Sequence, residues 1–580
     1  MVGVPPTMDL PWSVAHTDQY ISQFKLSAFK IPLSKMNRLL LSLTLILLIF
    51  SCTSREKVDA IYFNGTVYTV KADFEKAEAF AIKDGKFIDV GSSKDIRNQY
   101  QTEEEIDLME APVYPGFIDG HAHFIRYAKD LGDVNLFGTA SFDELIQRLQ
   151  KHAEQFPDEP VLLGQGWDQN NWEGGEFPIK DTLDILFPDK VVMLRRIDAH
   201  AVLTNQKGLD LAGVTARTRV SGGEVILKNG QPTGVLIDNA MNLLSDKMPE
   251  MSQVQKKELI QQAEANCFAV GITSLAEAGL DKSQIDLLDK MQKDGLLKMR
   301  IYAMINPTPQ NMDYYFSNGH YKTDYLNVRS FKIYGDGALG SRGACLIRPY
   351  SDDEDNFGFL RSEPQVFDSL AKLIFAKNFQ MNTHCIGDSA NRAITNIYAK
   401  YLKGKNDRRW RIEHAQVLAE NDFSKFGDYN ILPSVQPTHA TSDMDWAHER
   451  LGEERVKNAY AYQELLKQNG RLVLGSDFPV EDINPIYGFH SAVARQDDDN
   501  LPEGGFQPEN SLSREEALKG MTIWAAFGQF EEKERGCIAK GKLAAFVIWY
   551  RDIMEVPHEE LRDTKVIQTY SGGEKVYELQ

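Results

Sequence analysis

Short apolar stretches with the character of β-strands alternate with helical patterns over about residues 113–534 of the 580-residue chain. Helical spacing of apolar residues occupies Ser252–Val270, Glu363–Lys377 and Ser389–Lys403. The alternation predicts a parallel α/β fold, most simply a (β/α)8 TIM barrel with insertions. A doubly wound open sheet is the alternative, and the absence of a Gly-x-Gly-x-x-Gly sequence after the early strands disfavours it. The strand candidates are Val191–Leu194, Gly271–Ala276, Arg300–Ile305, Phe331–Tyr334, Gln380–His384, Trp410–Glu413, Ile431–Val435 and Arg471–Gly475.

Both ends of the chain outside this block have β character. Asn64-Gly65 and Asp84-Gly85 are hairpin turn sequences within the first β-rich end. We therefore expect one small β-sandwich built from residues 57–112 and 535–580, beside a barrel at 113–534. The β-rich stretches are Ala60–Val70, Ala79–Val90, Lys540–Trp549 and Val566–Tyr577.

A long segment inside the predicted barrel, about residues 137–235, is rich in Trp, Gly and Asp. Long connections at the mouth of a barrel often carry binding residues. We interpret this segment as an insertion near the mouth that covers the site.

Composition restricts the class of partner. A hydrophobic content of 42% and a charged content of 25% are typical of a folded globular protein. The net charge of −19 disfavours nucleic acid, because phosphate binding needs a basic face. The five cysteines form no Cys-x-x-Cys pair, so no disulfide framework is predicted and metal ligands must come mostly from other residues.

The N-terminal segment has the pattern of a signal peptide. Met36–Arg38 is followed by the apolar run Leu39–Phe50 and then by Ser51-Cys52, which resembles the lipobox of bacterial lipoproteins. Residues 1–51 are thus predicted to be an extension and a lipoprotein-type signal peptide, with Met36 as the natural start. Lipidation of Cys52 would tether the protein at the cell envelope, on the periplasmic side or at the outer membrane, without a membrane span. The alternatives are an uncleaved signal anchor and a signal peptide cut nearby.

His121 and His123 end the apolar strand candidate that begins at Pro115. Side chains alternate along a strand, so a His-x-His pair places both imidazoles on one face. Two neutral imidazoles make half of a divalent metal site, for which Zn²⁺ is the leading candidate.

Four later strand ends carry further side chains that can bind a metal: Lys332, His384, His414 and Asp477. In a barrel, the carboxyl ends of the strands face one shared cleft. Each residue alone has a structural explanation: a hydrogen-bonded histidine, an ion-paired lysine or an aspartate that caps a turn. Their occurrence in this order after a His-x-His strand indicates a metal centre.

The order His-x-His, Lys, His, His, Asp, with a small β domain from both ends, resembles the amidohydrolase superfamily. Local phrases resemble its YtcJ-like branch, which includes N-substituted formamide deformylase, from about residue 58 to the end. This resemblance implies a metal-dependent hydrolase of amide, N-formyl or N-acyl C–N bonds in small non-peptide molecules. The phrases are Gly-Phe-Ile-Asp-Gly-His121-Ala-His123, Gly-Gln-Gly-Trp167-Asp, Lys332-Ile-Tyr-Gly-Asp-Gly-Ala-Leu-Gly-Ser-Arg342, His384-Cys-Ile-Gly-Asp, Ile-Glu-His414-Ala-Gln and Gly-Ser-Asp477-Phe-Pro.

The resemblance also implies roles for these positions. His121 and His123 correspond to the ligands of a more buried metal, and His384 and His414 to those of a second. Lys332 corresponds to a lysine whose amine is carboxylated, so that its carbamate bridges two Zn²⁺ ions. The alternative is an unmodified Lys332 beside a single metal. Asp477 corresponds to the carboxylate at the end of the last strand. In that role it accepts a proton from a metal-activated water, which leaves hydroxide, and returns the proton to the leaving amine.

Other residues are candidates for substrate binding. His200 and His439 could donate to the developing oxyanion, or could be structural histidines. Arg342 could bind an anionic substrate group or pair with Asp336. Trp167 could wall the pocket or pack in a core. Glu413, Asp388 and Asp119 are candidates for orienting the imidazoles.

Two other functions stay open at this point. One is a mononuclear deaminase or cyclic-amide hydrolase, and the other is a lipoprotein that binds a metal or small molecule without catalysis. The expected partner is a small-molecule amide; nucleic acid is not expected, the membrane is reached only through the lipid anchor, and a homodimer is left open.

Overall fold

The computed structural model describes residues 55–157, 159–248 and 252–580. The chain divides into two units, Met1–Glu56 and Lys57–Gln580. Cys52 and the predicted signal segment lie outside the described residues. Among the helices that are described, none is both long and apolar enough to cross a membrane.

A parallel barrel occupies the centre of the second unit. Within the described ranges its eight strands follow the order β10-β17-β18-β20-β21-β22-β23-β24, and the short β19 (Tyr321–Lys322) adds to β20 in antiparallel fashion. This arrangement confirms the predicted TIM barrel. The strands are β10 (Phe117–Ala122), β17 (Ile272–Leu280), β18 (Arg300–Ile305), β20 (Leu326–Tyr334), β21 (Gln380–Cys385), β22 (Arg411–His414), β23 (Leu432–Val435) and β24 (Val473–Leu474).

The first and last strands meet just where the predicted site residues lie. The N–H of Asp477 donates to the carbonyl of His121 at 2.8 Å, and the N–H of His123 donates to the carbonyl of Phe478 at 2.9 Å. Gly120 permits this approach, because a Cβ there would lie 2.3 Å from Cγ1 of Val473. The closure therefore brings the His-x-His segment and the last-strand aspartate together.

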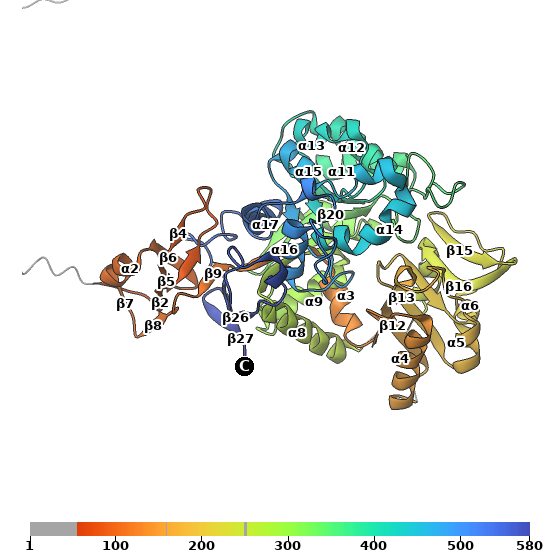
Figure 1. Cartoon of the computed structure of the whole chain (residues 1–580), viewed down its shortest axis with the longest axis horizontal. Helices are drawn as coiled ribbons and strands as arrows, with labels where there is room; N and C mark the ends of the chain where they lie inside the picture. Colours follow the sequence, from red (N-terminus) through yellow and green to blue (C-terminus); the bar gives the residue numbers. More distant parts are fainter. Residues whose placement is uncertain (1–54, 158, 249–251) are drawn as a thin grey trace, which may run out of the picture. The chain divides into compact units, whose positions relative to one another are not determined.

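Helices connect the strands and cover the barrel (Figure 1). Sequence signals fix several of their starts: Ser252 caps α8, Asp281 and Gln284 form a capping box on α9, and Thr308 caps α10 before a proline. The helices are α8 (Gln253–Ala269), α9 (Lys282–Lys293), α10 (Pro309–Asn318), α11 (Pro364–Ala376), α12 (Asp388–Leu402), α13 (Ser424–Asp428), α14 (Pro437–Arg455), α15 (Tyr462–Asn469), α16 (Pro485–Ala494), α17 (Arg514–Gly520) and α18 (Ile523–Gly528).

Two sheets made from both ends of the second unit form the β-sandwich. One has the order β6-β5-β2-β8, and the other β27-β26-β25-β9-β3-β4. Val547 on β25 pairs with Tyr114 on β9, which joins the C-terminal segment to the N-terminal one. The core between the sheets is aromatic, with Phe546 stacked on Tyr570 at 4.4 Å between ring centroids. The elements are β2 (Ala60–Phe63), β3 (Thr66–Tyr68), β4 (Lys76–Ala77), β5 (Ala79–Lys83), β6 (Lys86–Gly91), α2 (Ser93–Gln99), β7 (Tyr100–Gln101), β8 (Glu104–Asp107), β9 (Pro112–Pro115), β25 (Phe546–Trp549), β26 (Val566–Ser571) and β27 (Glu574–Glu578).

The predicted insertion forms a sheet of its own, in the order β11-β12-β13-β14-β16-β15, drawn in amber to yellow in Figure 1. Its strand β13 (Val191–Arg196) contains Val191–Leu194, which the sequence analysis assigns to the barrel, and that assignment is wrong. Val192 and Leu194 pack into one cluster and Val191 and Met193 into another, so both faces are buried. A strand covered on both faces reads as a continuous apolar run, as a barrel strand does. The other elements are β11 (Val134–Asn135), α4 (Phe142–Gln155), β12 (Val161–Trp167), α5 (Asp181–Leu186), β14 (Ala201–Thr204), α6 (Gln206–Ala212), β15 (Gly223–Lys228), β16 (Gln231–Asp238) and α7 (Asn242–Ser245).

Candidate metal centre and substrate cavity

A cavity of about 580 Å³ lies at the carboxyl ends of the barrel strands. Residues from the barrel, from α3 (Phe124–Asp130) and from the insertion line it. His121 is fully buried behind the lining. The predicted site residues that line it are His123, His200, Lys332, His384, His414, His439 and Asp477.

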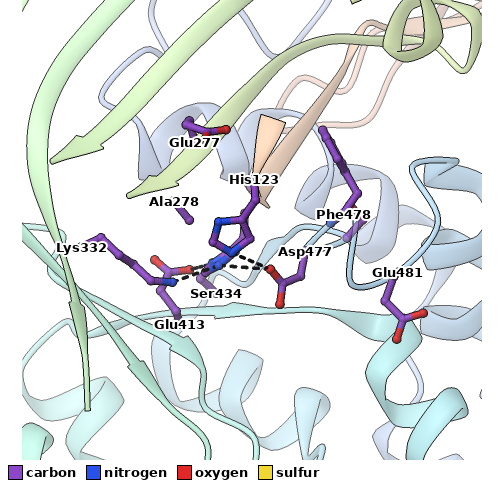
Figure 2. A network of polar contacts seen from close by, with 12 residues as sticks. His123, Glu277, Ala278, Lys332, Glu413, Ser434, Asp477, Phe478 and Glu481 are labelled. Carbon is purple, nitrogen blue, oxygen red and sulfur yellow. Dashed lines mark hydrogen bonds and ion pairs between the residues drawn. The ribbon is translucent and has the colours of Figure 1, made fainter. Parts of the chain in front are cut away.

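Asp477 is within reach of both histidines of the His-x-His segment. Its Oδ1 lies 3.1 Å from Nε2 of His123 and 3.6 Å from Nε2 of His121. Nζ of Lys332 lies 3.1 Å from the same Nε2 of His121. Figure 2 shows Lys332, His123 and Asp477 pointing toward one another from three separate elements. One atom from each of His121, His123 and Asp477 could therefore hold a single ion.

A second group shares Asp477. Ligand atoms of His414, His439 and Asp477 also lie close enough together to hold an ion. The His414 and His439 rings are nearly parallel, with centroids 5.8 Å apart. His384, which the resemblance pairs with His414, has its ring centroid 4.5 Å from that of His414, while its Nε2 lies 3.3 Å from the carbonyl oxygen of Gly337. His439, expected only as a donor to substrate, therefore joins the ligand candidates.

The chemistry of these side chains fits a cation. Burial lowers the pKa of His123 to about 4, and burial likewise lowers the pKa values of His121, His384, His414 and His439. Neutral imidazoles are the form that binds metal. Burial opposes ionisation of Asp477, yet His121 and His123 hold its pKa well below its usual range.

Several buried ligand atoms also lack partners. Within the described residues, Nδ1 of His414 and Nε2 of His439 make no hydrogen bond, and Oδ1 of Asp477 has only its ion-pair contacts with His121 and His123. Buried polar atoms are normally satisfied, and orphaned ones call for an explanation such as an ion. A divalent cation between these groups would satisfy them, so the residues fit a metal.

Glu413 and Arg411 on β22 orient the first histidine. Nδ1 of His121 lies 2.5 Å from Oε2 of Glu413, which also accepts from Nη2 of Arg411 at 2.9 Å. Burial raises the pKa of Glu413, but Arg411 and His121 outweigh it and hold the pKa below its usual range. The ionised Glu413 therefore keeps the proton of His121 on Nδ1 and leaves Nε2 free for a ligand bond.

The other two candidates for orientation differ from Glu413. Asp119 accepts from the backbone N–H of His121 at 3.0 Å and from Oγ of Ser476 at 2.6 Å, so it fixes the backbone rather than the ring. Asp388 accepts from the N–H of Ile347 at 2.8 Å.

Lys332 is fully buried, and burial lowers the pKa of its amine to about 8. A lysine in this position carries a substantial fraction of free amine at slightly alkaline pH. Lys332 lines the cavity together with Tyr334 on the same strand, and its Nζ lies 5.0 Å from the centroid of the Tyr334 ring.

The insertion supplies His200 to the cavity wall. Its ring centroid lies 5.3 Å from that of His384, and its Nδ1 lies 2.6 Å from Oδ1 of Asp238. Burial lowers the pKa of His200, but Asp238 outweighs burial and raises it. His200 is therefore a fixed donor at the side of the cavity next to His384.

Two predicted substrate residues do not line the cavity. Trp167 is fully buried in the core of the insertion, where its Nε1 donates to the carbonyl of Leu194 at 2.9 Å. Arg342 pairs with Asp352, Nη2 to Oδ2 at 2.9 Å, rather than with a ligand site or with Asp336. Asp336 instead accepts hydrogen bonds from the backbone N–H groups of Ile386 and Gly387, directly after β21. Trp167 is the last residue of β12 and Arg342 lies in the connection after β20, and local sequence does not determine the direction of either side chain.

Several cavity residues were not predicted from the sequence, among them Glu277, Tyr334, Arg361 and Glu481. Glu277 follows the predicted strand Gly271–Ala276 directly, so the strand-end rule that identified His384 could have identified it. Burial raises the pKa of Glu277 to about 8 and that of Glu481 to about 8. Arg361 lies in a connection, where no local pattern marks it.

A closed parallel barrel with neutral histidines, an ionised aspartate and a buried lysine at its carboxyl end defines a metal-dependent hydrolase of the TIM-barrel type. The chain belongs to the Amidohydrolase family, whose profile matches residues 104–577, and lies in its YtcJ-like branch.

Comparison with individual proteins agrees with this assignment. The chain is 31% identical to YtcJ of Bacillus subtilis (strain 168), which is named as an amidohydrolase, over 90% of this chain and 99% of that protein. It is 25% identical to N-substituted formamide deformylase of Arthrobacter pascens, over 90% of this chain and 98% of the deformylase. A crystal structure of an uncharacterized metal-dependent hydrolase from Pyrococcus horikoshii superposes with a TM-score of 0.70, at 26% identity over 86% of this chain and 99% of that one.

Proposed function

We propose that this hydrolase cleaves a C–N bond of a small non-peptide amide, of the N-formyl or N-acyl kind. The observation that carries the proposal is Asp477, which both histidine groups share at the edge of the cavity. Similarity to a protein named as an N-substituted formamide deformylase supports the choice of bond.

His121, His123, His414, His439 and Asp477 would hold the metal, with His384 beside them. A divalent ion such as Zn²⁺ supplies Lewis-acid polarisation of a carbonyl and makes water more acidic. Asp477 is ionised, so its carboxylate accepts a proton from the attacking water and returns it to the departing amine nitrogen. His200, held by Asp238, donates toward the carbonyl oxygen as negative charge develops there.

We further propose that Lys332 is carboxylated in the active protein. Its free amine nitrogen bonds to the carbon of CO₂ and releases one proton, which gives a carbamate with two oxygen ligands. The lowered pKa of Lys332 favours this reaction, because only the unprotonated amine can react. An unmodified Lys332 beside one metal is the competing form.

The location remains a proposal that rests on sequence. Acylation of Cys52 would hold the enzyme at the bacterial cell envelope, with the small-molecule substrate as its partner. Cell fractionation tests this: wild type should follow the membrane fraction, and Cys52→Ser should not. Recovery of both proteins in the same soluble fraction would overturn the anchor.

The function is tested first by metal content and turnover on the same sample. The chain beginning at Lys57 is purified without added metal, and zinc is counted by plasma mass spectrometry. About two zinc ions per chain support the carbamate-bridged form, and about one supports the mononuclear form. N-alkyl formamides and N-acetyl amines are then assayed for released amine, before and after chelation and after Zn²⁺ with bicarbonate. Absence of turnover in every reconstituted sample would overturn the proposed reaction.

A further inference from the structure

The cavity has a cluster of cationic side chains besides the metal-ligand candidates. Arg126, Lys129 and Arg195 line the same cavity as His123 and Asp477. Arg126 and Lys129 belong to α3, the helix that begins immediately after His123. Arg195 belongs to β13 of the insertion. The cluster is therefore assembled from two parts of the fold.

Contacts within the chain leave most of these donors unused. Nε of Arg126 is buried and makes no hydrogen bond within the described ranges, although Oδ2 of Asp130 lies 3.3 Å away. The Arg195 guanidinium has one ion pair among those same residues, from Nη1 to Oδ1 of Asp130 at 3.9 Å, which is beyond hydrogen-bond distance. Each guanidinium has five N–H donors, so both side chains can donate hydrogen bonds to an additional anionic group.

The local charges also favour an anion. Lys129 and Arg195 border a smaller adjoining cavity together with Asp133, and burial raises the pKa of Asp133 to about 7. Burial and the neighbouring Arg126 lower the pKa of Arg195, and Asp130 and Asp133 offset this only in part. Three cationic groups thus lie beside Asp130 and Asp133, and burial raises the pKa of both carboxyl groups.

Gln165 links the two arginines. It is the register partner of Arg195 between β12 and β13, and its Oε1 lies 3.5 Å from Nη2 of Arg126. Glu277 lines the same cavity, but backbone N–H groups of α3 donate to its carboxylate. Two guanidinium groups held in this way match the oxygens of a carboxylate or a phosphate.

We propose that Arg126 and Arg195 bind an anionic group of the substrate, a carboxylate or a phosphate, while its scissile amide lies at Asp477. This inference rests on the proposed function and narrows the substrate class to N-formyl or N-acyl compounds that carry an acidic group. It also gives the insertion a role, because half of the anion site comes from β13.

The test compares matched substrates on the full chain loaded with zinc. N-formyl derivatives of glycine through 6-aminohexanoic acid supply a carboxylate at increasing distance, and their terminal amides are the neutral partners. N-formyl-O-phosphoethanolamine supplies a phosphate. For the best length, we expect the anionic compound to exceed its neutral partner roughly 10- to 100-fold in kcat/KM, chiefly through KM.

Variants show whether the two arginines cause this preference. Arg195→Gln and Arg126→Gln should bring the ratio of kcat/KM between the anionic and neutral substrates close to one. Arg195→Lys should retain part of the preference because charge remains without the planar fork. Arg392→Gln is the control of equal charge change, since Arg392 pairs with Asp422 and does not line the cavity. Equal kcat/KM for charged and neutral substrates in wild type, or a preference that survives in both glutamine variants, would overturn the inference.

A failure of the proposed reaction is distinguishable. If the wild type hydrolyses none of the compounds, the anion site is tested by binding alone. Binding is measured as the rise in the thermal unfolding midpoint when 6-formamidohexanoate is added. A rise in wild type and Arg392→Gln that Arg195→Gln lacks supports the anion site. No rise, or the same rise in Arg195→Gln, overturns it.

Discussion

Substitution of Glu413 by Gln tests how the buried network below the metal centre works. Glu413 contacts His121 at 2.5 Å and Arg411 at 2.9 Å, and all three side chains are fully buried. Glutamine keeps the shape of the glutamate side chain but removes its negative charge. It also places an NH₂ group, which is a donor, next to the donor groups of His121 and Arg411. Two charge-assisted contacts are weakened, which predicts a loss of about 3–5 kcal/mol in the free energy of unfolding. Because His121 also loses its orienting acceptor, zinc affinity should fall roughly 10- to 100-fold.

The assay separates these two effects. Urea unfolding measures stability, and competition with a chromophoric chelator measures zinc affinity on samples shown to be folded by circular dichroism. Glu531→Gln is a matched control, because Glu531 forms a buried pair with Arg535 and accepts from Asn327 at 3.2 Å, and none of the three lines the cavity. It should lose stability but keep zinc affinity. Unchanged affinity in Glu413→Gln, or an equal loss in the control, would refute the orienting role.

The same variant predicts a pH dependence of stability. The folded-state pKa of Glu413 lies below the ordinary value of about 4.3, so its contribution is fully present above that value. The contribution is lost as the pH falls toward the folded-state pKa. Metal-free wild type should therefore lose more stability than Glu413→Gln between about pH 6 and pH 3. Parallel stability curves over this window would contradict the assignment.

Asp477→Asn should lower kcat by roughly 10²- to 10⁴-fold at saturating zinc, since the amide cannot accept the proton of water; near-normal kcat would show that another base acts. Lys332→Ala should abolish turnover and reduce a two-zinc protein to one zinc or less, and turnover retained at full metal content would exclude the carbamate. Arg342→Gln should leave kcat/KM unchanged, because its partner is Asp352 outside the cavity lining; a tenfold rise in KM would restore it to the substrate site. Trp167→Phe should cost about 2–4 kcal/mol of unfolding free energy with KM unchanged, because it loses the hydrogen bond to Leu194 and leaves a cavity in the core of the insertion.

The barrel could be predicted because each of its strands carries a local signal that tertiary packing reinforces. Apolar runs such as Arg300–Ile305 appear in the structure with the predicted bounds. The exception is Val191–Leu194, whose pattern is the same because the insertion sheet buries both of its faces. An apolar run reports burial on two faces but not which sheet provides it. The assignment therefore needed the strand's pairing partners, which local sequence does not show.

Some residues of the candidate site could likewise be predicted from local sequence, and others could not. The six predicted ligand candidates lie in the last residues of barrel strands or just beyond them, so backbone geometry directs them to one edge, and the family resemblance supplied their expected roles. They are His121, His123, Lys332, His384, His414 and Asp477. Trp167 ends a strand of the insertion and Arg342 lies in the connection after β20, so the directions of their side chains depend on the packing of the insertion and of the segment around Asp352.

The residues that would select the substrate come from packing between parts of the fold. Arg126 belongs to the barrel and Arg195 to the insertion, and their sequence neighbourhoods share no motif. They become one site only because β13 lies beside β12, whose Gln165 contacts Arg126. The residues of the reaction could thus be predicted from the sequence, because the barrel brings the carboxyl ends of its strands to one edge. The proposed anion site depends on how the insertion packs against the barrel, so it could be inferred only from the structure. Its test must therefore vary the substrate as well as the protein.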